Sequence, residues 1–258
     1  MKKQNKKNNF NKLIIIIPII LLTLTILAIV IYKMVVPVYS VSDRTQKLRQ
    51  KQGEDDTVIG WLRLQGTNVD YPVVYSSNEK FYNDEYDYDY LWTNSDSLKL
   101  NSRVIVWGHN VKNVSNQPML PQKNFTAFES LPAFLNYDFA KENEYIQYTI
   151  DGKNYLYKIY SVTMLNKETF QYNEYMAEDE KKEYINNSIK ESYYKYDVEV
   201  SSKKNLITLA TCTRFFDKTT TIIKVEGVMV DNNEKLKKYK VTKNKKYNIV
   251  ENKMKGDD

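Results

Sequence analysis

An uncharged stretch of twenty residues near the N-terminus constrains the possible structure of the chain more than any other feature. Residues 13–32 read LIIIIPIILLTLTILAIVIY and are bounded by Lys12 and Lys33. A helix of about 20 apolar residues is long enough to cross the hydrocarbon core of a bilayer. Five lysines and no acidic residue precede the stretch, and the positive-inside rule then predicts a cytoplasmic N-terminus and an exported remainder. We therefore predict a cytoplasmic basic tail over residues 1–12 and a single transmembrane anchor over residues 13–32.

A cleaved signal peptide is the alternative to this anchor. Signal peptides have an apolar region of about 7–15 residues followed by a small-x-small cleavage site. The run here is longer, and Val38-Tyr39-Ser40 is a poor match to such a site. The sequence therefore favours an uncleaved anchor in the cell membrane, with the rest of the chain outside the cell.

The net charge of +6 over 258 residues does not indicate a nucleic-acid partner. The excess of lysine lies in residues 1–12 and in residues 231–258, and the part between them is nearly neutral. A single Cys and a single His exclude a disulfide framework, a Cys-based zinc cluster and a multi-His metal site. We expect no metal ion and no cofactor.

The exported part has the pattern of a mostly β domain. Short runs of apolar and β-branched residues, separated by turn signals, predict strands within 57–75, 102–110, 144–165, 205–212 and 219–230. Asp151-Gly152 predicts a tight hairpin turn inside the third of these runs. The regions 76–102 and 111–144 look like loops with short helices.

One longer helix is predicted over 177–195. Ile185, Ile189 and Tyr193 recur at helical spacing and predict one apolar stripe on it. With strands dominant and few crossovers, a closed β-barrel of seven to eight strands with peripheral helices fits best. We place this domain at 57–231, after a stalk over 33–56 and before a Lys-rich polar tail over 232–258.

The only cysteine and the only histidine are the candidate catalytic residues of this domain. Cys212 ends one predicted strand, and His109 follows another. A nucleophilic Cys needs an imidazole partner to supply thiolate, and strand ends are where a rigid scaffold presents reactive groups. Each residue alone is also compatible with an inert packing or loop role.

Together these residues resemble the signatures of a known family. Residues 208–212 read TLATC and match the TLxTC motif of sortases, whose last residue is the nucleophile. Residues 107–110, WGHN, resemble the histidine motif of the same enzymes. The segment 61–74 and the helix before the Cys strand are similar to class B sortases, and the likeness extends over about Ile59 to Val230.

The resemblance also implies an arginine that this sequence lacks. Sortases usually carry it some eight to thirteen residues after the Cys, where this chain has no Arg. Arg214 lies two residues after Cys212, and Lys224 lies within the expected window. The resemblance leaves three possibilities open: Arg214, Lys224 as the alternative, or no substitute. A lysine would supply charge without the bidentate fork of Arg.

The resemblance implies a membrane-anchored cysteine transpeptidase. Cys212 would attack a Thr carbonyl in the C-terminal sorting signal of a surface protein, and His109 would act as acid and then as base. A peptidoglycan precursor or cross-bridge amine would resolve the thioester. Class B members favour Asn-Pro-type or related Pro-containing signals. Thr208, Ala210 and Thr211 are the expected substrate-binding residues, with Thr208 and Ala210 on the strand face of Cys212 and Thr211 on the other.

Two other functions remain open. A Cys-dependent cell-wall peptidase would use water as acceptor, but it would place the Cys on a helix N-terminus ahead of the His. A non-catalytic sortase-like binding or assembly module would have a structural Cys212, and the missing Arg fits that reading. Among transpeptidases, general anchoring is favoured over pilin polymerisation because no second apolar span follows Val228.

Overall fold

The computed structural model describes residues 16–29, 41–76, 90–99, 102–215, 221–232 and 240–255. The chain divides into two units, one of residues 1–40 and 235–237 and the other a compact body of 41–234 and 238–258. In the first unit a helix spans 16–29, inside the predicted anchor, and the other residues of that anchor lie outside the described part. None of the helices in the described ranges is long and apolar enough to cross a bilayer.

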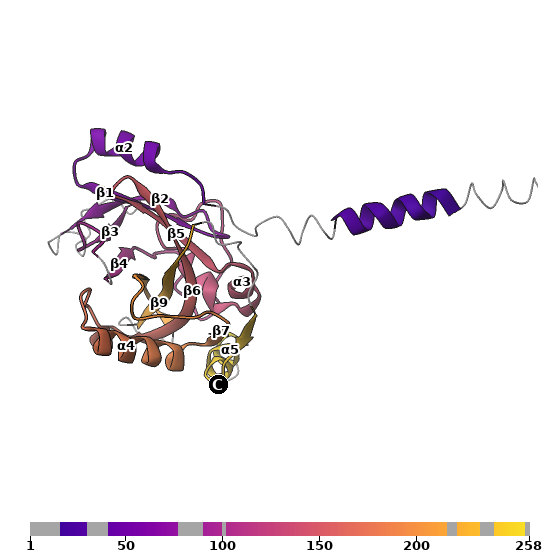
Figure 1. Ribbon diagram of the computed structural model, residues 1–258. Helices are drawn as coiled ribbons and strands as arrows, with labels where there is room; N and C mark the ends of the chain where they lie inside the picture. The colour runs from indigo at the N-terminus through magenta and orange to yellow at the C-terminus, as the bar shows by residue number, and fades with distance from the viewer. Residues whose placement is uncertain are drawn as a thin grey trace, which may run out of the picture. The chain divides into compact units, whose positions relative to one another are not determined.

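The body is built on a closed β-barrel, as predicted (Figure 1). Its strands follow the order β1-β2-β3-β4-β8-β9-β6-β5, and β5 pairs with β1 to close it. The barrel is mixed, because β2 pairs with β3 and β4 pairs with β8 in parallel. The barrel strands are β1 (Val58–Leu64), β2 (Asp70–Tyr75), β3 (Leu91–Thr93), β4 (Arg103–Gly108), β5 (Tyr145–Ile150), β6 (Lys153–Asn166), β8 (Leu206–Thr213) and β9 (Thr221–Val230).

The predicted hairpin is present between β5 and β6. Asp151 and Gly152 form its turn, with φ of 52° and 68°. Two-residue hairpin turns of this kind need positive φ at both central positions, which Asp tolerates and Gly adopts freely. The predicted strands within 57–75 are β1 and β2, and those around the Cys motif are the antiparallel pair β8 and β9.

The strand β3 is the main element that the sequence pattern missed. It lies in the region 76–102, which we expected to be loop with a short helix. With three residues, β3 is too short to show an alternating pattern, and its Trp92 and Thr93 are held by pairing with β2 and β4. Residues 77–89, 100 and 101 of the same region lie outside the described part.

The predicted helix over 177–195 is α4 (Glu178–Glu191), but its buried face differs from the prediction. Ile189 is 41% exposed, and Tyr193 lies beyond the helix end. The buried residues of α4 are Lys181, Tyr184, Ile185 and Ser188. Of the predicted apolar stripe, only Ile185 is buried within α4; two polar residues and a tyrosine make up the rest of the buried face, which lies over the charged pair Lys224–Glu226.

The compact body begins before the predicted start of the barrel domain at 57. The helix α2 (Thr45–Glu54) buries Leu48 against the barrel. Arg44 donates two hydrogen bonds to the carboxylate of Asp70 on β2, at 2.9 and 3.0 Å. Residues 41–56 of the predicted stalk are thus part of the body, and α2 and α4 lie on opposite sides of the barrel (Figure 1).

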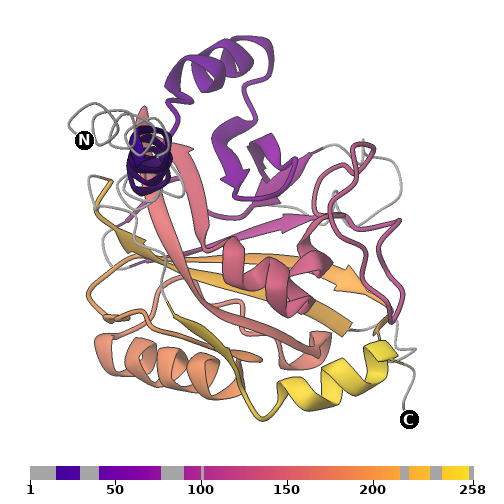
Figure 2. The ribbon, with the colours of Figure 1, turned by 90° about the vertical axis from the view of Figure 1, so that its right-hand side faces the viewer.

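The body also extends beyond residue 231. The strands β7 (Tyr194–Tyr196) and β10 (Val241–Lys243) pair, and α5 (Tyr247–Lys255) follows. Tyr247 and Val250 are buried, and the rings of Tyr247 and Tyr194 lie 5.2 Å apart. Figure 2 shows α5 beside the barrel, near the end of α4. The remaining short helices are η2 (Leu131–Leu135), α3 (Tyr137–Glu142) and η3 (Lys167–Thr169).

Candidate active site

Cys212 and His109 lie at the same end of two neighbouring strands. The strands β4 and β8 are parallel, and Trp107 is paired with Ala210 in their register. Carried two residues further, the same register aligns His109 with Cys212. The pairing continues past the end of the ladder, because the Thr211 hydroxyl donates a 2.6 Å hydrogen bond to the Gly108 carbonyl. Parallel strands are about 4.8 Å apart, so residues far apart in the sequence are brought together here.

Both side chains belong to the face of the sheet that points away from the main core. The main core holds Leu209 and Ile223, whereas their chain neighbours Ala210 and Ile222 belong to a second cluster on the opposite face. We call this second set the outer-face cluster. Its buried members are Leu48, Val58, Val74, Trp92, Ile105, Trp107, Phe170, Ala210 and Ile222.

The outer-face cluster surrounds the candidate pair. Cys212 is two residues after Ala210 on β8 and is paired with Ile222 on β9. The His109 ring lies against Trp92 of the same cluster, with ring centroids 4.9 Å apart. The two candidate residues are therefore on one face and at one end of the barrel.

Asn110 ties the histidine loop to the cysteine strand. Its side-chain NH₂ donates to the Cys212 carbonyl at 3.1 Å and to the Asn113 carbonyl at 2.9 Å. Its side-chain oxygen accepts from the Asn113 N–H at 3.1 Å. The His109 carbonyl in turn accepts from the Phe128 N–H. Asn110 thus links the two segments, a contact of a motif residue that only the fold explains.

The Cys212 thiol is partly shielded from water although the residue itself is exposed. Burial raises the pKa of the Cys212 thiol above its ordinary value of 9.0, and the charge of Lys167 opposes this rise. The pKa of Tyr172 is also raised, first by burial and then by the proximity of Cys212. Lys167 and Tyr172 are thus neighbours of the thiol that the sequence did not indicate. Both come from the connection between β6 and α4.

Neither predicted basic residue is paired with Cys212 across the sheet. The position opposite Cys212 on β9 is Ile222, which is fully buried. Arg214 is exposed, just after the end of β8. Residues 216–220 of the loop that follows lie outside the described part.

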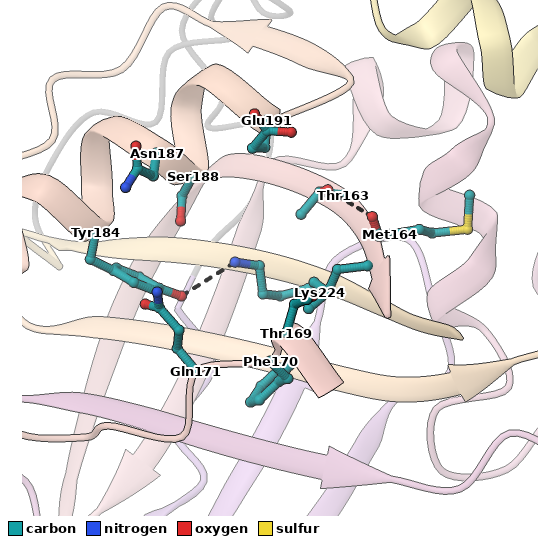
Figure 3. A pocket seen from close by; sticks show the side chains of 11 residues that line it. Thr163, Met164, Thr169, Phe170, Gln171, Tyr184, Asn187, Ser188, Glu191 and Lys224 are labelled. Atoms are coloured by element: carbon teal, nitrogen blue, oxygen red, sulfur yellow. Dashed lines mark hydrogen bonds between the residues drawn. The ribbon is translucent and has the colours of Figure 1, made fainter. Parts of the chain in front are cut away.

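Lys224 is engaged elsewhere, in a buried group beneath α4. Its ammonium is 3.0 Å from the Glu226 carboxylate and donates to the Tyr184 hydroxyl at 3.4 Å (Figure 3). The Tyr184 hydroxyl donates to Glu226. Burial alone would raise the pKa of Glu226, but Lys224 and its other partners hold that pKa below the ordinary value. Lys224 is therefore the counter-ion of a buried carboxylate.

The three predicted substrate-binding residues are buried. The register confirms that Thr208 and Ala210 share a face with Cys212 and that Thr211 is on the other. The Thr208 hydroxyl lies 3.5 Å from Glu226, and Ala210 packs in the outer-face cluster. All three side chains pack against neighbouring strands, and their expected role in substrate binding stays a prediction.

A cavity of about 230 Å³ opens beside α4 and is lined in part by Lys224, Tyr184 and Gln171 (Figure 3). Cys212 and His109 do not line it. It lies over β6 and β9 and is walled by the connection that carries Phe170. Within the described ranges, no group of three or more His, Cys, Asp or Glu side chains could hold a metal ion.

Two curated relatives resemble the chain in sequence. Sortase B of Listeria monocytogenes is 26% identical over 179 residues, which cover 64% of this chain and 67% of the relative. Sortase B of Staphylococcus aureus is 23% identical over 182 residues, which cover 67% of this chain and 70% of the relative. No family model matches the chain.

Solved structures resemble its fold. Sortase B of Clostridium perfringens has a TM-score of 0.58 and 24% identity, covering 71% of this chain and 99% of its own. A sortase B–substrate complex from Staphylococcus aureus has a TM-score of 0.59 and 20% identity, covering 72% and 86%. The resemblance that the two motifs indicate is therefore confirmed: in sequence and in fold, the chain is similar to the class B sortases.

Proposed function

We propose that the protein is a membrane-anchored cysteine transpeptidase of the sortase type. It cleaves the C-terminal sorting signal of a surface protein and transfers that protein to an amino group of the cell wall. One observation carries the proposal: β4 and β8 pair in parallel up to Trp107 and Ala210, and this register, carried two residues further, aligns His109 with Cys212 on one face of the barrel. The bond from Asn110 to the Cys212 carbonyl supports it, because it fixes the two loops to each other.

The reaction uses one thiol and one imidazole. The Cys212 thiolate attacks the Thr carbonyl carbon, and the carbonyl oxygen becomes an oxyanion. The C–N bond then breaks, and the leaving amine takes a proton from the His109 imidazolium. An incoming amine attacks the resulting thioester and gives its proton to His109, and the thiolate leaves. One residue thus serves as general acid and then as general base.

The raised pKa of Cys212 agrees with a thiol that is mostly protonated in the resting protein. Substrate binding excludes more water from the site, and a nearby positive charge then has a larger effect on the thiolate. The reactive thiolate is therefore a minor form until substrate is bound.

The anchor is part of the proposal. Residues 13–32 would hold the catalytic body at the outer membrane surface, with the N-terminus in the cytoplasm. The sorting signals and the peptidoglycan precursor would then share that surface with Cys212. The described helix over 16–29 is compatible with this arrangement.

A peptide assay on the full chain in detergent micelles tests the proposal. Fluorogenic peptides with Pro-containing sorting pentapeptides are incubated with and without an amine acceptor, and products are identified by mass spectrometry. Cys212→Ala and His109→Ala should abolish cleavage. Asn124→Ala, an exposed asparagine of the loop after His109, is the control and should keep full activity. If the peptide is only hydrolysed, and the amine acceptor gives no transfer product, the result would favour a cell-wall peptidase instead.

A non-catalytic binding module is the second candidate, and Ile222 is the observation that favours it. An apolar residue opposite Cys212 supplies no charge to the oxyanion. The two candidates separate on one measurement, because a binding module retains sorting peptides without cleaving them. Peptide binding without any acyl-enzyme on Cys212 would therefore refute the transpeptidase.

A further inference from the structure

In the described part of the β8–β9 pair, the residue opposite Cys212 is apolar and carries no positive charge. An oxyanion formed on a Thr carbonyl requires a positive or hydrogen-bonding group near it, and losing such a donor costs about 10²–10³ in rate in other enzymes. Ile222 stands opposite Cys212, and Lys224 is bound to Glu226 and Tyr184 further along the face. Neither of these two β9 residues therefore supplies the charge.

The end of β6 lies in the same row of the barrel as Cys212. Leu165 on β6 is paired with Ile222 on β9, and Ile222 is paired with Cys212 on β8. Leu165 packs against the outer-face cluster, so the three residues share that face. Lys167 follows Leu165 by two residues and begins η3, whose first turn is capped by the Asn166 side chain.

Two strand spacings of about 4.8 Å separate β6 from β8. The four-carbon stem of a lysine is flexible and can carry its ammonium across much of that distance. Lys167 is exposed at this end of the barrel, and its charge acts on the Cys212 thiol in the direction that favours thiolate. Tyr172 of the same connection also neighbours the thiol, so the connection passes beside the site.

We propose that Lys167 supplies the positive charge that stabilises the Cys212 thiolate and the oxyanion formed when it attacks. The inference rests on the proposed transpeptidase function and assigns its missing basic residue. A lysine lacks the bidentate fork of an arginine, so Lys167 acts as a point charge. It acts from the β6–α4 connection, on the opposite side of Ile222 from the nucleophile. Other charged or ionisable residues near Lys167 or Cys212 in the described part of the chain include Glu168, Tyr172, His109 and Arg214.

Two measurements on the full chain test Lys167. The first is the pH dependence of Cys212 alkylation by a small neutral reagent, which needs no substrate. Lys167→Ala should move its midpoint to higher pH, and Lys167→Arg should leave it in place. Lys153→Ala, an exposed lysine at the far end of β6, is the matched control and should also leave it in place.

The second measurement is peptide cleavage by the same variants. Lys167→Ala should lower kcat about 10²-fold with little change in KM, as expected for loss of a group that acts on the oxyanion. Lys167→Arg should keep most of the rate, since it keeps the charge.

An unchanged midpoint and an unchanged kcat in Lys167→Ala would overturn the assignment. So would a loss of rate confined to Arg214→Ala, or to Lys218→Ala in the part outside the described ranges. If the unaltered protein cleaves no peptide while Lys167→Ala still shifts the alkylation midpoint, the transpeptidase proposal fails and the influence of Lys167 on the thiol stands.

Discussion

The Asn110 side chain donates a hydrogen bond to the Cys212 carbonyl at 3.1 Å, across strands that are about a hundred residues apart in the sequence. The same side chain both donates to and accepts from the Asn113 main chain. The loop that carries His109 is thereby fixed to the strand that carries Cys212. The relative placement of His109 and Cys212 thus depends on this amide together with the pairing of β4 and β8 and the Thr211–Gly108 hydrogen bond.

Replacing Asn110 should therefore disturb the position of His109 relative to Cys212 more than it lowers the stability of the fold. Asn110→Ala removes three hydrogen bonds near the surface, and a displacement of about 1 Å at a reacting group can cost up to 10²-fold in rate. We expect kcat to fall about 10-fold or more with KM nearly unchanged. Steady-state kinetics on Asn110→Ala and on the control Asn124→Ala measure this. Equal rates for both variants would show that Asn110 does not position His109.

Alkylation of Cys212 should be slow at neutral pH in the protein without substrate. Burial raises the pKa of the thiol, and the thiolate is the form that reacts. The rate should therefore rise with pH, and its midpoint should lie above 9.0, the ordinary thiol value. A stopped-flow titration with a neutral alkylating reagent checks the direction. A midpoint below that of a free cysteine peptide would contradict the prediction.

The Lys224–Glu226 pair should contribute to the free energy of unfolding and not to catalysis. Lys224→Met leaves the Glu226 carboxylate buried without its ion-pair partner, which we expect to cost about 3 kcal/mol of unfolding free energy. Lys224→Met combined with Glu226→Leu removes both charges and should recover much of that loss.

Urea unfolding of both variants measures these costs. Peptide cleavage by the double variant, at a temperature where it is folded, should be close to that of the unaltered protein. If the stable double variant is inactive, Lys224 has the catalytic role that we assign elsewhere.

The helix α2 should contribute measurably to the stability of the body. Leu48 is 2% exposed and packs with Val58 and Val74. Leu48→Ala leaves a cavity and should cost about 2–3 kcal/mol. Thermal unfolding compares it with Leu120→Ala, whose leucine is 49% exposed and should change the Tm little. If the two leucines have equal effects, residues 41–56 behave as a free stalk.

The sequence predicted the barrel well because its strands are long and their turns are explicit. Asp151-Gly152 fixes the β5–β6 hairpin, and the apolar runs give β4, β8 and β9. The three-residue β3 carries no periodic pattern, so its place came only from pairing with β2 and β4. The packing of α2 and α5 on the body was also missed, because both helices are rich in lysine and bury few apolar side chains.

The sequence predicted the two residues of the candidate site that occur once in the chain, but not the residues around them. Cys212 and His109 stand out because the chain has one of each. Asn110, Lys167 and Tyr172 belong to abundant residue types, and their nearness to the thiol depends on strand register and on the path of one connection. The sequence offers Arg214 and, as the alternative within the motif spacing, Lys224; only the structure shows that Lys224 pairs with Glu226, two residues further along the same strand.

The parallel pairing of β4 with β8 has a consequence for when the site can exist. Everything from the histidine loop through β5, β6 and α4 must be synthesised and closed into a loop before the two strand ends meet. Closing a long loop is entropically costly and comes late in assembly. In an incomplete chain Cys212 therefore has no His109 beside it, and the two residues meet only in the finished barrel.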